Sequence, residues 1–207
     1  MADKQLMREE LKTFFDIAWH SKHMFCMYCK LYEHDETRIN LLKSVSSEFF
    51  GDLQSMWHEQ ILLDICKLMD PCRGKNLTVD YFLCKLSNQF TGEETVRIEK
   101  FVKDADPLLN KARQPRNKFI AHIDKEKTMA GRPLGGLSNN EIEAGMQMCK
   151  MINDFYDNFQ DILNVISSKI NGSTPEEYLM PLDPTGVVAE EFISFLEKSK
   201  SLVRSIS

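Results

Sequence analysis

Hydrophobic positions recur at helical spacing along nearly the whole chain. In the first segment they follow at steps of three, four or seven residues: Leu11, Phe14, Phe15, Ala18, Phe25, Tyr28 and Tyr32. A helix of 3.6 residues per turn places such residues on one face, so the pattern predicts a long amphipathic helix. A second helix is predicted from two successive stripes: Leu42, Val45, Phe49, Leu53 and Met56, then Trp57, Ile61, Ile65 and Leu68.

Turn residues and capping motifs separate the helices that follow. Asp70-Pro71 and Gly74 predict the end of the second helix. A short helix is predicted at residues 78–88. Thr91-Gly92-Glu93-Glu94 matches the capping box, in which the first and last side chains each bond a free backbone N–H at a helix start.

Two prolines fall within the helix that this capping box opens. Pro107 and Pro115 lack a backbone N–H, and a proline ring clashes with the preceding helical turn. We therefore expect them to interrupt or re-aim the helix. Pro115 also suits the first position of a new helix.

The clearest apolar stripe follows the loop residues from Gly131 to Ser138. It consists of Ile142, Met146, Cys149, Ile152, Tyr156, Phe159, Leu163 and Ile166. A long core helix is predicted here, opened by a second capping box at Ser138–Glu141 and stopped by Asn171-Gly172. A last helix is predicted to present one further set of residues on one face: Val188, Phe192, Phe195 and Leu202.

These patterns predict an all-α fold, an antiparallel helical bundle with long core helices and a C-terminal helical appendage. We find no internal repeat and no convincing strand. We expect residues 1–170 to form the bundle, and residues 171–207 to form a helical extension packed on the same domain.

Composition and charge narrow the classes of function. The chain has 207 residues and a net charge of -5, with a pI near 5.6. This charge argues against a surface that binds nucleic acid all over. A local basic patch remains compatible with it, because salt screens charges beyond roughly 8 Å at physiological ionic strength.

The chain is expected to be soluble and cytoplasmic. Its N-terminus is charged and lacks the apolar region of a secretion signal. No apolar run reaches the roughly 20 residues that span a bilayer, so no membrane partner is expected. Six cysteines without a signal peptide are typical of free cytosolic thiols.

A histidine–cysteine cluster in the first predicted helix suggests zinc. His20, His23, Cys26 and Cys29 are each three residues apart, and these are zinc ligands. Steps of three drift around a 3.6-residue helix, so the four side chains cannot all converge. We favour core thiols with partly exposed histidines and assign no metal, although metal binding by Cys26 and Cys29 stays open.

The basic run KARQPRNK is the strongest candidate for chemistry. It places four bases, Lys111, Arg113, Arg116 and Lys118, within eight residues and before His122. A helix restarting at Pro115 would point free N–H groups and a positive dipole end at the same place, which would bind a phosphate.

An imidazole, a guanidinium and a carboxamide follow one another closely in this run. His122 lies about 120° around an ideal helix from Arg116, with Asn117 beside the arginine. RNA cleavage needs one group to move a proton from the 2′-hydroxyl and one to neutralise charge on the phosphate. No metal or other cofactor is required for that route. A helix start with solvated bases is the alternative interpretation.

The run RNKFIAH followed by Ile123-Asp124 resembles the signature of HEPN domains (higher eukaryote and prokaryote nucleotide-binding). It is most similar to the abortive-infection AbiU-type branch, in which R-N-K-x-x-A-H-x-D is typical. The resemblance implies an all-α bundle, often a homodimer, and a metal-independent endoribonuclease in a toxin–antitoxin or phage-defence system.

The resemblance also implies roles for individual residues. Arg116 would stabilise the phosphate, His122 would act as general acid or base, and Asn117 would orient them. From the basic run itself, we expect Lys111, Arg113 and Lys118 to bind phosphate groups. Two copies of the motif would face each other across a dimer, and an antitoxin protein would be a further partner. The alternative is a non-catalytic module that binds a nucleotide or a partner protein.

Overall fold

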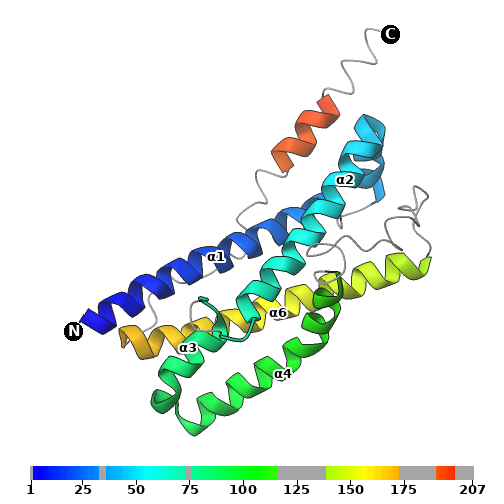
Figure 1. Ribbon diagram of the computed structural model, residues 1–207. Coiled ribbons are helices and arrows are strands. Elements are labelled where there is room, and N and C mark those ends of the chain that lie inside the picture. The colour runs from blue at the N-terminus through cyan, green and yellow to red at the C-terminus, as the bar shows by residue number, and fades with distance from the viewer. Residues whose placement is uncertain (1, 33–35, 73–75, 116–138, 173–189, 199–207) are drawn as a thin grey trace, which may run out of the picture. The chain divides into compact units, whose positions relative to one another are not determined.

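All regular elements that the structure describes are helices (Figure 1). The computed structural model describes residues 2–32, 36–72, 76–115, 139–172 and 190–198. The helices are α1 (Ala2–Tyr32), α2 (Glu36–Met69), α3 (Val79–Leu86), the 3-10 turn η1 (Ser87–Gln89), α4 (Gly92–Pro115) and α6 (Asn139–Asn171), with another at 190–198. The predicted all-α bundle is confirmed. None of these described helices combines the length and the apolar character that a bilayer span requires.

The chain divides into two compact units, and the two long N-terminal helices contribute to both. The first unit contains Met1–Ala18 and Leu62–Met180, and the second contains Trp19–Ile61 and Pro181–Ser207. The domain boundary expected at residue 170 stays a prediction.

Aromatic side chains form the core of the first unit. The ring of Phe14 on α1 lies 5.2 Å from that of Phe82 on α3 and 6.0 Å from that of Phe159 on α6. All three side chains are fully buried. Phe101 on α4 packs 5.7 Å from Phe155 on α6. These contacts join helices that are far apart in sequence, and burying each phenylalanine contributes about 2–3 kcal/mol.

The second unit is held by Tyr32, whose side chain is buried at the end of α1. Its hydroxyl donates to the backbone carbonyl of Phe50 at 3.1 Å, and its ring lies 6.5 Å from Trp57. Burial raises the pKa of Tyr32 to about 12. In the same unit, Arg38 on α2 bonds both carboxylate oxygens of Glu190 at 3.0 Å and so anchors the helix at 190–198.

The stripe predicted for the first part of α2 is wrong beyond Leu42. Leu42 is buried as predicted, but Val45, Phe49 and Met56 are 47%, 59% and 63% exposed, and Phe50 is buried in place of Phe49. For Phe49 and Met56 the reason is a break at Ser46, whose backbone is extended (φ -162°, ψ 99°). The Ser46 hydroxyl accepts the N–H of Phe49 at 3.3 Å, as an N-cap does. A second helical segment therefore starts here with a new rotational phase.

The face predicted for the last helix differs from the buried face of its described part. The buried residues are Ile193 and Leu196, while Phe192 is 39% exposed and Phe195 is 63% exposed. Phe192 still contacts the buried ring of Phe50, at 6.4 Å between ring centres. The other two residues of the predicted face, Val188 and Leu202, lie outside the described residues.

The predicted start of α4 is confirmed and the predicted interruption is not. The N–H of Thr91 donates to the Glu94 carboxylate at 2.8 Å, and the N–H of Glu94 donates to the Thr91 hydroxyl at 3.3 Å. The helix then runs through Pro107 to Pro115 without a break. Each proline costs one backbone hydrogen bond. Burial of Phe101, Leu108 and Ala112 on one face offsets that cost.

Candidate functional site

Helices α4 and α6 form an antiparallel hairpin in the first unit (Figure 1). Contacts along it set the register: Lys169 Nζ lies 2.7 Å from a Glu94 carboxylate oxygen, and an Arg97 nitrogen lies 3.7 Å from a carboxylate oxygen of Asp161. Further along, Lys111 Nζ lies 3.6 Å from Met151 Sδ. The chain therefore leaves α4 at Pro115 and enters α6 at Asn139 on the same end of the hairpin. The HEPN-like run lies in the segment that joins them.

Two of the six predicted site residues fall within the described part of the chain. Lys111 is exposed and Arg113 is half-buried, on opposite sides of the last turns of α4, with the buried Ala112 between them. Basic residues at the C-terminal end of a helix interact favourably with its dipole. This placement alone accounts for both residues without a ligand. The other four, Arg116, Asn117, Lys118 and His122, lie outside the described residues.

The helix start expected at Pro115 is wrong. Pro115 belongs to a helix that begins at Gly92, so the positive end of that helix dipole lies at the opposite end of α4. The last turns of α4 carry the negative end, which does not attract phosphate. Anion binding at Lys111 and Arg113 therefore depends on the charges of the side chains.

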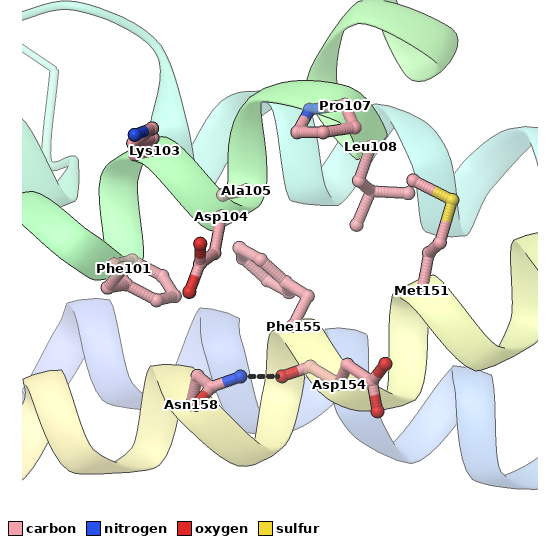
Figure 2. Close-up of a pocket in the computed structure, with 10 residues that line it drawn as sticks. All are labelled: Phe101, Lys103, Asp104, Ala105, Pro107, Leu108, Met151, Asp154, Phe155 and Asn158. Carbon is pink, nitrogen blue, oxygen red and sulfur yellow. Dashed lines mark hydrogen bonds between the residues drawn. The ribbon is translucent and has the colours of Figure 1, made fainter.

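A groove of about 510 Å³ lies between α4 and α6 (Figure 2). Its apolar floor includes Phe101, Leu108 and Phe155, and its polar rim includes Lys103, Asp104, Asp154 and Asn158. Pro107 also lines it, and the missing N–H of this proline leaves the Lys103 carbonyl without its usual helical donor. In the sequence, the feature that marks this groove is Pro107 inside an amphipathic helix. The sequence predicts an interruption or a change of direction of the helix at this proline, and no groove.

The charges of the groove do not suit an RNA backbone. The lining contains two carboxylates, those of Asp104 and Asp154, and one ammonium, that of Lys103. Asn158 is engaged as well, because its Nδ2 donates to the carbonyl of Asp154 at 2.6 Å (Figure 2). Phosphate groups would meet net negative charge here. Of the residues that line the groove, Met151 is the one that contacts a residue of the basic run, Lys111.

The histidine–cysteine cluster of α1 lies in the second unit. The His23 ring stacks on Trp19 at 4.9 Å, and its buried Nδ1 has no hydrogen-bond partner. Burial lowers the pKa of His23, and nearby His20 lowers it further. Within the described ranges, no three His, Cys, Asp or Glu side chains come together as a metal site. The stacked, neutral imidazole therefore acts as a packing element.

Comparison with known protein families identifies the relationship. The family model for AbiU2, a HEPN family, matches residues 5–184. This chain belongs to the AbiU2 HEPN family. The match spans most of the chain and includes the run from Arg116 to Asp124, so the resemblance seen in the sequence is confirmed. Comparisons with curated proteins and with solved structures find no match.

Proposed function

We propose that this AbiU2 HEPN protein is a metal-independent endoribonuclease with a toxin or phage-defence role. The observation that carries the proposal is the run from Arg116 to Asp124, which has the spacing of the HEPN signature in a chain of that family. Its substrate is RNA, and its active site is shared between two copies of the chain.

The proposed reaction is an internal transfer at phosphorus. His122 takes the proton from the 2′-hydroxyl of the substrate, and the 2′-oxygen attacks the adjacent phosphorus atom. The bond to the 5′-oxygen breaks, leaving a 2′,3′-cyclic phosphate and a 5′-hydroxyl. Arg116 neutralises the charge that develops on the phosphate oxygens, and Asn117 orients the two groups.

The hairpin supports this proposal in one respect. The segment with the motif is attached at Pro115 and Asn139, and α4 is anchored close to its attachment point by the buried Ala112, while α6 is anchored from Cys149 onward. A catalytic segment needs such support, because misplacing a reacting group by about 1 Å can cost a hundredfold in rate. The exposed Lys111 and half-buried Arg113 supply positive charge at its entry.

The direct test uses purified full-length protein with a mixed-sequence RNA in the presence of EDTA. We expect fragments with 2′,3′-cyclic phosphate ends, and we expect His122→Ala and Arg116→Ala to lose at least about a hundredfold in rate. Matched controls are His20→Ala and Arg8→Ala, which remove an exposed histidine and an exposed arginine elsewhere. Equal cleavage by His122→Ala would end the catalytic proposal.

The same experiment distinguishes the alternative, a non-catalytic nucleotide- or partner-binding module. In that case the RNA stays intact, while its binding weakens in Arg116→Ala and falls as salt concentration rises. Cleavage by a contaminating nuclease would vary between protein preparations and would be the same for the wild type and the variants.

A further inference from the structure

Two cysteines lie beside one carboxylate, that of Asp80 on α3, in the first unit. Cys72 lies in the connection that follows α2, and Cys84 lies in α3, one helical turn beyond Asp80. Cys72 is partly buried and Cys84 is exposed, and both are free thiols. Neither belongs to the proposed ribonuclease site.

Asp80 contacts both cysteines. Its Oδ2 accepts the backbone N–H of Cys72 at 2.8 Å, and its Oδ1 accepts the thiol of Cys84 at 3.9 Å. Residues four apart in a helix share one face, so Cys84 lies on the same side of α3 as the carboxylate. The chain after α2 therefore returns over the first turn of α3 and brings Cys72 toward Cys84.

Local capping keeps this arrangement in place. The hydroxyl of Thr78 accepts the N–H of Tyr81 at 3.2 Å and caps α3, and Thr78 is itself buried. Tyr81 also donates to the Glu10 carboxylate of α1 at 2.8 Å. The first turn of α3 is thus tied to the unit at several points, so the carboxylate that contacts both cysteines lies on a well-anchored element.

The two thiols also interact electrostatically. Partial desolvation raises the pKa of Cys84 although this thiol is exposed, and Asp80 and Cys72 raise it further. The raised pKa keeps Cys84 protonated at neutral pH, and a protonated thiol is a poor nucleophile.

We propose that Cys72 and Cys84 form a reversible disulfide when the protein meets a peroxide. The small fraction of exposed Cys84 that is ionised attacks one oxygen of hydrogen peroxide, giving a sulfenic acid and, with one proton, water. Because the pKa of Cys84 is raised, this step is slow at neutral pH. The Cys72 sulfur then attacks the Cys84 sulfur and displaces a second water. Two thiols and one peroxide become one disulfide and two waters, so two electrons pass from sulfur to oxygen.

The disulfide would join the end of α2 to α3 across a short loop. Such a cross-link restricts the unfolded chain, and a loop of this size corresponds to a rise in Tm of roughly 6–12 °C in a chain of this length. Thiol reductants would reverse the change.

The test treats the reduced full-length protein with hydrogen peroxide and maps its cysteines by mass spectrometry without reduction. We expect one cross-linked peptide pair that contains Cys72 and Cys84, together with the rise in Tm. Cys72→Ser and Cys84→Ser should abolish both, and Cys26→Ser, in the other unit, should keep both. The proposal would be overturned if Cys84 were oxidised to sulfinic acid without a cross-link. It would also be overturned if the cross-link joined other cysteines.

A second variant tests the role of Asp80 without depending on the stability change. Asp80→Asn keeps an oxygen that can accept the N–H of Cys72 but removes the negative charge beside Cys84. The thiolate fraction of Cys84 should rise, so the disulfide should form severalfold faster at pH 7, with its pH profile shifted to lower pH. An unchanged rate and pH profile would contradict the arrangement.

Discussion

The carboxylate of Glu94 lies 2.7 Å from the ammonium of Lys169 and joins the first turn of α4 to the last turn of α6. The same carboxylate accepts the N–H of Thr91 in the capping box. The Glu94 side chain thus caps the start of α4 and also holds α4 against α6. The antiparallel hairpin that supports the HEPN motif depends on this contact at its far end.

Acid should weaken this junction. The hydrogen bond from Lys169 lowers the pKa of Glu94, and the bond from the Thr91 backbone adds to the effect. Since the folded state lowers this pKa below its ordinary value of 4.5, the stabilisation is present above that pH and is lost as pH falls through the folded value. We expect Glu94→Gln to be less stable than the wild type at pH 6, with the difference shrinking toward pH 3. Urea unfolding midpoints at both pH values check this, and a constant difference would contradict it.

Mild acid should also weaken the second unit through His58. Burial lowers the pKa of His58, an effect that Glu59 partly opposes. The folded state therefore favours the neutral imidazole, and the unfolded state binds more protons as pH falls below about 6.5. We expect stability to decrease between pH 7.5 and pH 5.5, and His58→Gln to reduce that slope. His20→Gln, at an exposed position on α1, is the comparison variant and should change the slope less, because it acts through its effect on the pKa of His23.

The two neighbouring phenylalanines of α2 should differ sharply in their contribution to stability. Phe50 is 6% exposed and packs against Phe192, whereas Phe49 is 59% exposed. We expect Phe50→Ala to cost about 3–5 kcal/mol in the free energy of unfolding, and Phe49→Ala about 0.5 kcal/mol or less. Denaturant unfolding of both variants measures this. Equal losses would mean that the rotational phase after Ser46 differs from the one described here.

The proposed composite site predicts complementation between inactive variants. If Arg116 of one chain serves His122 of the other, a heterodimer of Arg116→Ala and His122→Ala contains one intact site and one empty site. We expect co-refolded, equimolar mixtures to regain about a quarter of the wild-type rate, since half of the dimers are mixed and each has one of two sites. Each variant refolded alone should stay inactive. No recovery from mixtures that do form heterodimers would place the whole site in a single chain.

At the candidate site, the residues of the basic run could be predicted from the sequence, but their helical context could not. These residues and their resemblance to a HEPN signature are visible in the sequence, and the family match confirms that relationship. The helix start predicted at Pro115 is wrong. A proline can also lie within a helix when buried side chains on one face of that helix offset the lost hydrogen bond. Leu108 and Ala112 decide that outcome through contacts made in the folded unit.

Two further features, the cysteines beside Asp80 and the groove beside Pro107, could not be predicted from the sequence. The sequence shows Cys72 and Cys84 as two separate thiols, and only the folded connection brings both to Asp80. The groove beside Pro107 is likewise formed by residues of α4 and α6 that lie far apart in the chain.

The sequence by itself determined the helices of α1 and α6, the capping box of α4 and the family of the protein. These features depend on helical periodicity and on residues within a few positions of one another. The tertiary structure alone decided which aromatic side chains are buried after Ser46, which face of the helix at 190–198 packs inward, and which cysteines lie beside Asp80. Burial is set by contacts with distant parts of the chain, and a single extended residue such as Ser46 is enough to rotate the apolar pattern that follows it.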